Sequence, residues 1–152
     1  MSDIRYAPPA GSDLVVIKEL LESCQLPTKD LTESHLTSFL VATTNDNGII
    51  GVVGLEVFPP SPHALLRSLA VKDSHRGQGI ATALYNQMEK VARETHGIKH
   101  LYLLTTTAAD YFRSRQGFQR VERKAAPNVI QATAEFSAIC PCSAVCLRKD
   151  LS

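Results

Sequence analysis

The sequence contains His75-Arg76-Gly77-Gln78-Gly79-Ile80-Ala81 between an apolar run at residues 65–71 and an amphipathic segment at residues 80–95. This order predicts a strand, a tight turn and a helix. Gly77 and Gly79 lack a Cβ, so the backbone can turn sharply and approach a ligand closely. The free N–H groups and the dipole of the helix favour an anion there, and Arg76 adds a positive charge. The turn is therefore predicted to hold a phosphorylated ligand.

The length and composition place the chain among soluble globular proteins. At 152 residues a single domain spanning 1–152 is expected. The formal net charge of +1 gives no support for a nucleic-acid partner. No apolar run reaches membrane-spanning length, and no secretory signal is visible, which predicts a cytoplasmic protein that does not bind membranes. The four cysteines, Cys24, Cys140, Cys142 and Cys146, are accordingly expected to be reduced thiols.

Hydrophobic periodicity predicts an α/β fold built around one sheet. The strands are expected at residues 2–7, 39–44, 49–58, 65–71, 101–105, 118–123 and 143–148. The helices are expected at residues 14–24, 31–36, 80–95 and 127–139, and a further one runs through residues 108–112 and stops at Gly117.

Two motifs in this order carry a resemblance to a known family. Arg76-x-x-Gly79-x-Ala81 resembles the Arg/Gln-x-x-Gly-x-Gly/Ala signature of the GCN5-related N-acetyltransferases (GNAT), and Gly117-Phe118 is similar to the pair that often ends a later helix in that family. The resemblance implies a GNAT fold, with a single mixed, mostly antiparallel sheet of about six to seven strands. That sheet would be splayed at the acetyl-CoA site and flanked by helices on both faces.

The same resemblance implies transfer of an acetyl group from acetyl-CoA to a small-molecule amine, without a metal. In the family, backbone amides of the loop cradle the pyrophosphate, and backbone of the preceding strand meets the pantetheine and the thioester carbonyl. The implied cofactor-binding residues are Leu69, Ala70, Val71, Arg76, Gly77, Gln78, Gly79, Ile80 and Ala81. A homodimer is left open as the assembly.

A narrower resemblance concerns the acceptor. The segments at residues 54–56, 65–71, 103–108 and 136–141 look like the arsenic-resistance N-acetyltransferase-like branch, which is similar to amino-acid acetyltransferases. It implies an amino-acid-like or anion-bearing acceptor, with a link to arsenic or phosphinate detoxification. Thr105 is a candidate acceptor-binding residue in one of these segments.

Glu56 is the candidate base. It follows an apolar strand, and burial in a cleft would raise its pKa toward neutrality, as a general base requires. The alternatives are a solvated strand end, or proton transfer through water with no base at all.

Arg67 is the second candidate for acceptor binding. It stands inside an apolar strand, and a buried Arg needs an anionic partner. The partner is either Glu56 on the adjacent strand or an anionic group of the acceptor, and the two are not exclusive. Alternation along the strand places Arg67 on the same face as Leu65 and Leu69.

Tyr111 is the candidate acid for the leaving thiolate. The family often places Tyr four residues before the Gly of its Gly-Phe pair, where this sequence has Arg113, so Tyr111 is either the acid or a packing residue. This departure favours a non-catalytic acyl-CoA-binding domain as one alternative, and protein N-acetylation is another. The cysteines of residues 140–146 match no zinc spacing and are expected to be inert core thiols.

Overall fold

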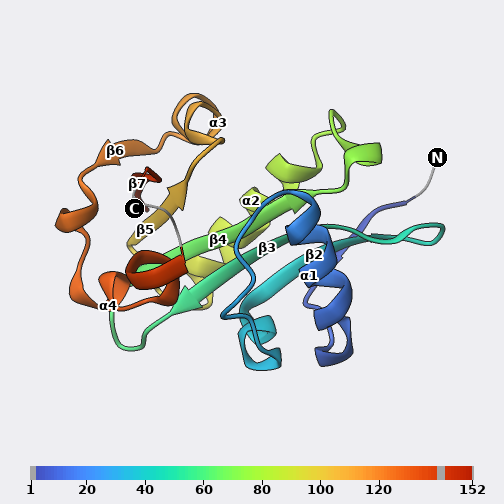
Figure 1. The fold of residues 1–152 in the computed structure, drawn as a ribbon, viewed down its shortest axis with the longest axis horizontal. Helices are drawn as coiled ribbons and strands as arrows, with labels where there is room; N and C mark the ends of the chain where they lie inside the picture. Colours follow the sequence, from blue (N-terminus) through green and yellow to red (C-terminus); the bar gives the residue numbers. More distant parts are fainter. Residues whose placement is uncertain (1–2, 140–142, 152) are drawn as a thin grey trace. The chain divides into compact units, whose positions relative to one another are not determined.

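The computed structural model describes residues 3–139 and 143–151. The strands are β1 (Arg5–Ala7), β2 (Phe39–Thr44), β3 (Gly48–Val57), β4 (His63–Val71), β5 (His100–Thr105), β6 (Gln119–Val121) and β7 (Val145–Asp150). The helices are α1 (Leu14–Ser23), α2 (Ile80–Glu94), α3 (Ala109–Arg115) and α4 (Asn128–Gln131) (Figure 1).

The strands form one seven-stranded sheet in the order β1-β2-β3-β4-β5-β7-β6. β1 with β2, β2 with β3, β5 with β7 and β6 with β7 pair antiparallel, whereas β4 and β5 run parallel. The parallel pairing covers only His63–Leu65 against His100–Tyr102, although β4 continues to Val71. The predicted α/β fold with a mixed, mostly antiparallel sheet is confirmed.

Contacts divide the chain into two compact units. The first unit consists of Met1–Glu56 and Arg67–Val91, and the second consists of Val57–Leu66 and Ala92–Ser152. The boundary runs through β4, so that the His63 end of the strand belongs to the second unit and the Arg67 end to the first.

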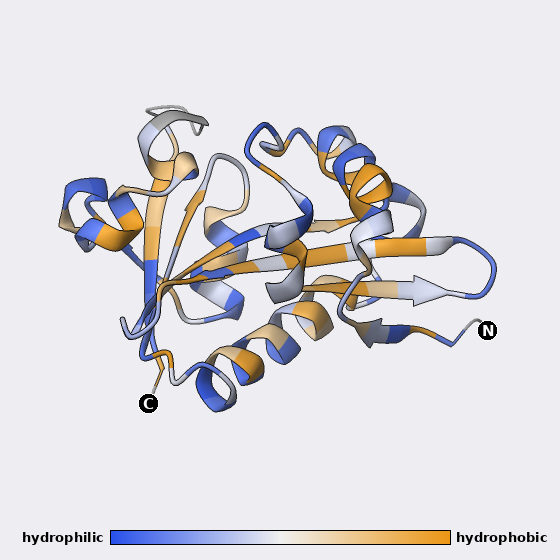
Figure 2. Ribbon diagram, turned by 90° about the horizontal axis from the view of Figure 1, so that it is seen from below, coloured by the Kyte–Doolittle hydropathy of each residue, from blue (hydrophilic) through white to orange (hydrophobic). Residues whose placement is uncertain are grey.

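In the first unit, helices cover both faces of β3. Val52 is fully buried in a cluster with Leu21 of α1. Its neighbour Gly51 faces the other way, and a Cβ at Gly51 would lie 2.9 Å from a methyl group of Leu84 in α2. Figure 2 shows the strands mostly apolar and the helices apolar on the side that faces them. Close approach of α2 therefore depends on a residue without a side chain.

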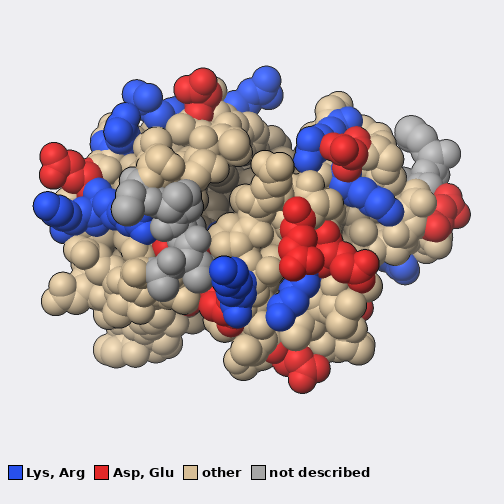
Figure 3. Space-filling model, viewed as in Figure 1, with Lys and Arg blue, Asp and Glu red and all other residues tan. Residues whose placement is uncertain are grey.

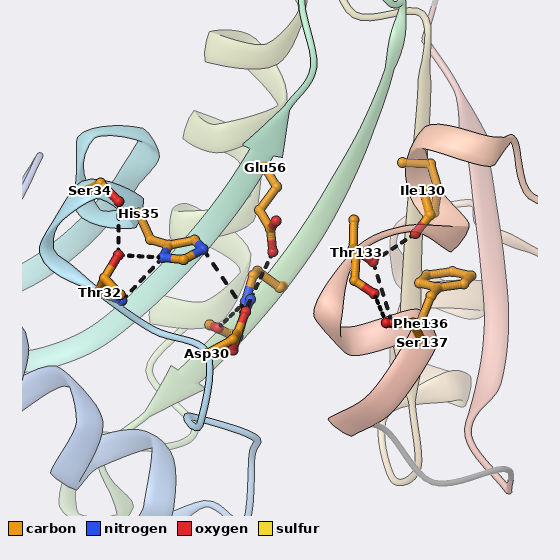
Figure 4. Close-up of polar contacts among 11 residues, drawn as sticks. Asp30, Thr32, Ser34, His35, Glu56, Ile130, Thr133, Phe136 and Ser137 are labelled. Carbon is orange, nitrogen blue, oxygen red and sulfur yellow. Dashed lines mark hydrogen bonds and ion pairs between the residues drawn. The ribbon is translucent and has the colours of Figure 1, made fainter.

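In the second unit, a helix expected at residues 127–139 is interrupted. α4 ends at Gln131, and a separate π-helical turn spans Glu135–Ile139. The hydroxyl of Thr133 donates to the Ile130 carbonyl at 2.7 Å and accepts the Phe136 N–H at 3.3 Å (Figure 4). A side chain that bonds nearby backbone groups competes with the helical ladder. The prediction of one continuous helix was wrong for this reason.

Among the described residues, no helix has the length and apolar character needed to span a bilayer. On the face seen in Figure 3, Lys and Arg are interspersed with Asp and Glu, and no basic stripe crosses it.

Candidate active site

The glycine-rich turn adopts the predicted strand–turn–helix arrangement. Gly77 and Gly79 have φ angles of +81° and +77°, which side-chain-bearing residues rarely adopt. Residues 76–79 are exposed, and α2 begins immediately after them at the buried Ile80. Left-handed residues alternating with ordinary ones turn successive N–H groups toward a common side, which suits an anion.

The Arg76 side chain is paired within the protein. Its NH1 lies 2.8 Å from a carboxylate oxygen of Asp73, and its Nε donates to the Val71 carbonyl at 3.3 Å. A longer contact of 3.5 Å reaches the Cys24 sulfur. The guanidinium therefore ties the loop to the end of β4 and to α1. Its contact with a phosphate stays a prediction.

β4 carries a backbone irregularity just before the residues predicted to meet the cofactor. Ser68 has a φ of +61° inside the strand, a conformation that costs a non-glycine residue energy. Its hydroxyl accepts a hydrogen bond from Arg67 Nε at 3.0 Å. Ala70 and Val71 are buried beyond it, and Leu69 is half-buried. Simple alternation, which placed Arg67 and Leu69 on one face, cannot be carried across a left-handed residue.

Arg67 lies at the centre of an ion-pair network in the first unit. Its side chain has no exposed area, and its NH1 and NH2 donate to the two oxygens of Asp30 at 2.5 and 2.9 Å. NH1 also donates to Glu56 at 2.8 Å. Of the two partners left open by the sequence, the internal carboxylate of Glu56 is the one observed. Asp30, 37 residues away in the chain, is an additional one.

The Asp30 carboxylate is held in its ionised form. Burial alone would raise the pKa of Asp30, but the hydrogen bonds and charge of Arg67 outweigh it and lower that pKa below its usual value. No local pattern links Asp30 to Arg67, so sequence reasoning missed it. The one available signal was the requirement of a buried guanidinium for compensating charge.

Glu56 is neither a free strand end nor fully buried. Its side chain is 15% exposed at the end of β3, and it points toward Asp30 and His35 (Figure 4). The interpretation as a solvated residue does not hold, because the carboxylate is paired with Arg67. Its role as a base stays a prediction.

The same residues do not suit a metal ion. Ligand atoms of Asp30, His35 and Glu56 lie within 4.8 Å of one another. Both carboxylates, however, already share the NH1 group of Arg67. A cation would have to displace this buried guanidinium, so the residues fit an ion-pair network better than a metal centre.

Comparisons with known proteins identify the family of this chain. The sequence profile described as "Acetyltransferase (GNAT) family" matches residues 13–120. The chain belongs to this family.

Solved structures of GNAT enzymes share its fold. N-acetylglutamate synthase from Neisseria gonorrhoeae, complexed with coenzyme A and L-arginine, has a TM-score of 0.80 at 20% identity, covering 99% of this chain and 34% of that one. This chain thus spans about a third of that protein. A GNAT acetyltransferase from Staphylococcus aureus has a TM-score of 0.79 at 20% identity, with 99% and 100% covered.

Diaminobutyrate acetyltransferase from Paenibacillus lautus, complexed with L-2,4-diaminobutyric acid and coenzyme A, has a TM-score of 0.67 at 14% identity, with 100% of both chains covered. Among curated proteins, none matches the sequence.

The remaining candidate residues of this GNAT family member lie in the second unit. Tyr111 is half-buried in α3, and its hydroxyl oxygen accepts a hydrogen bond from Gln116 at 3.0 Å. Arg113, at the position where the family often has Tyr, is exposed. The Thr105 hydroxyl accepts the Ala108 N–H at 2.9 Å, so it shapes the turn into α3. Both hydroxyl oxygens therefore accept hydrogen bonds within the second unit.

Cys146 is the described residue on which the prediction of inert core thiols in residues 140–146 can be checked. This residue is buried in the core of the second unit, and burial raises the pKa of its thiol to about 11. Such a group stays protonated and packs as a small apolar residue. Cys140 and Cys142 lie outside the described residues.

Proposed function

We propose that this enzyme acetylates the amine of a small, amino-acid-like acceptor, and that Glu56 removes the proton of the acceptor's ammonium group. The observation that carries the proposal is the placement of Glu56, which is fixed by Arg67 at one oxygen and partly exposed. Of the residues that the structure describes, none besides Arg67 hydrogen-bonds to this carboxylate. An oriented carboxylate with an uncommitted oxygen is what proton removal requires.

The proposed step balances in atoms and charge. Glu56 accepts a proton from the ammonium group, directly or through water, and the freed nitrogen attacks the carbonyl carbon of the thioester. The carbon–sulfur bond then breaks, and the thiolate of coenzyme A takes the proton of the Tyr111 hydroxyl. The nitrogen, which still carries one proton more than the amide product, returns that proton to the Tyr111 oxygen through water, and Glu56 releases its proton to solvent. Gln116 donates to the Tyr111 oxygen, which helps to stabilise the negative charge that forms there.

The proposed class of acceptor rests on the charge of the site and on the similarity of the fold to amino-acid acetyltransferases. Two carboxylates surround one guanidinium, so Asp30, Glu56 and Arg67 together carry one net negative charge, which attracts an ammonium group. The structures of N-acetylglutamate synthase and diaminobutyrate acetyltransferase support an amino-acid-like acceptor. Arg67 would then act on the acceptor indirectly, through the carboxylates of Asp30 and Glu56. The Thr105 hydroxyl would donate a hydrogen bond to the acceptor.

Replacement of Glu56 tests the proton step. In Glu56→Gln we expect kcat to fall by about a hundredfold at unchanged acetyl-CoA affinity. Glu33→Gln removes a charge from an exposed residue nearby in the first unit and is the matched control. A Glu56→Gln enzyme with parental kcat would show that the proton leaves by another route.

A panel of acceptors tests the substrate class. Thiol release from acetyl-CoA would be measured with α-amino acids, diamino acids, phosphinate amino acids, polyamines, aminoglycosides and an unstructured lysine peptide. We expect the amino acids and their analogues to give the highest kcat/KM. Preference for the peptide would instead indicate protein acetylation, and no release with any amine would indicate a non-catalytic acyl-CoA-binding domain.

The position of the cofactor is the second part of the proposal. Acetyl-CoA would bind with its pyrophosphate on residues 76–81, so Gly79→Val should abolish coenzyme A binding in a calorimetric titration. Gly48→Val is a matched control, because Gly48 also has a positive φ and open space where a Cβ would stand, but lies in the β2–β3 turn. Equal binding by both variants and the parent would contradict the loop assignment.

The cytoplasmic location, the homodimer and a role in detoxification stay predictions.

A further inference from the structure

Asp30 accepts more hydrogen bonds from the Arg67 guanidinium than Glu56 does. It accepts hydrogen bonds from both terminal nitrogens, whereas Glu56 accepts one, from NH1 alone. A two-point contact between guanidinium and carboxylate is both stronger and more directional than a single one. Asp30 is thus the main counter-ion of Arg67.

His35 faces Asp30 in a defined tautomer. The backbone N–H of Thr32 donates to His35 Nδ1 at 3.1 Å, so Nδ1 carries no proton while this bond is made. A neutral His35 then has its proton on Nε2, which lies 4.0 Å from an Asp30 oxygen. The positive end of this N–H points at Asp30, and the bond to Thr32 holds the ring at the start of the turn Glu33–Ser38.

We propose that Asp30 is a positioning residue for acetyl transfer. It holds Arg67 in place and neutralises its charge, so that Arg67 orients the Glu56 carboxylate but cancels only part of that carboxylate's negative charge. The inference rests on the proposed role of Glu56. Among the described residues of the first unit, three charged or titratable groups face Glu56. They are Arg67 on β4, Asp30 on the loop between α1 and the turn Glu33–Ser38, and His35 on that turn. Removal of the Asp30 charge leaves Arg67 with more uncompensated charge toward Glu56, which then binds its proton less tightly.

The test is the pH dependence of kcat/KM in Asp30→Asn. We expect the acidic limb of the profile to move to lower pH by roughly one unit and kcat to fall about tenfold, with coenzyme A affinity unchanged. Asp30→Glu keeps the charge and should restore the parental midpoint. Glu33→Gln removes a charge nearby and should leave the midpoint in place. An Asp30→Asn profile with the parental midpoint would overturn the inference, because a merely structural loss lowers the rate without moving the profile.

The parent protein provides a second measurement if Asp30→Asn does not fold. The side-chain carboxyl carbon of Glu56 would be followed by NMR as the pH is lowered. We expect two steps, its own titration and a smaller one when Asp30 is protonated, because two interacting sites titrate together. A single step with no response to Asp30 would overturn the inference. Failure of Glu56 as the base appears separately, as parental kcat in Glu56→Gln.

Discussion

β4 carries two side chains that can bear a positive charge, Arg67 and His63, and their surroundings have opposite effects on that charge. Arg67, in the first unit, is fully buried and stays charged because two carboxylates surround it. His63, in the second unit, stacks on His100 with ring centroids 5.0 Å apart. Its Nδ1 is buried without a hydrogen-bond partner among the described residues. Burial lowers the pKa of His63, and the charges of His100 and Arg148 add to this effect.

Burial alone therefore does not decide whether a side chain is ionised. A buried cation persists where an anion is placed against it, and a titratable one loses its proton where none is. Asp150 lies close by in the second unit, but it bonds His100 and Arg148, each at 2.8 Å.

Loss of Arg67 should produce the largest change. Arg67→Met leaves two carboxylates without their cation, so we expect the free energy of unfolding to fall by about 3–5 kcal/mol in urea denaturation. The triple variant Arg67→Met/Asp30→Asn/Glu56→Gln removes the charges together and should regain part of this stability. If the single variant unfolds like the parent, the network is not a determinant of stability.

Acid should destabilise the protein in two separate windows. The pKa of His63 is lowered, so its contribution is complete above the unfolded value of about 6.5 and is lost as the pH falls below it. The loss is at most about 1.4 kcal/mol per pH unit. The pKa of Asp30 is lowered as well, so its contribution persists until the pH falls below about 3.9. Urea titrations from pH 8 to pH 3 should show both, and His63→Phe should remove only the first.

Replacement of His63 should have a small effect at neutral pH. His63→Phe keeps a ring against Tyr102 and removes the buried Nδ1 that has no partner among the described residues. We expect a change of less than about 1 kcal/mol, in the stabilising direction, because an unsatisfied buried polar atom is costly. Thermal unfolding at pH 7.5 measures it. A loss of several kcal/mol would mean that the imidazole makes a contact essential to the second unit.

The cysteines should show the smallest effect. Burial raises the pKa of Cys146 to about 11 against the opposing charge of Arg123, so this thiol should resist alkylation at pH 8 in the folded enzyme, whereas the half-buried Cys24 is labelled. The triple replacement of Cys140, Cys142 and Cys146 by Ala should retain acetyl transfer. Loss of transfer in the folded triple variant would revive a thiol function.

Much of the fold could be predicted from local patterns. The strand over Phe39–Thr44 and the start of α2 at Ile80 agree with the expected bounds, because hydrophobic periodicity and glycine placement act over a few residues. The break at Thr133 could not be predicted, since a threonine hydroxyl bonds either solvent or the backbone, and the choice depends on burial.

Local sequence patterns were enough to predict the glycine turn, the apolar strands and the need of Arg67 for an anion. These follow from the absence of a Cβ, from side-chain periodicity and from the cost of burying a charge. The identity of the anions that compensate Arg67, in contrast, depends on the three-dimensional fold. Asp30 and Glu56 reach it from 37 and 11 residues away, through a loop and a neighbouring strand. Such a pairing leaves no periodic trace along the chain, because it arises from where the backbone brings the groups together and not from their spacing.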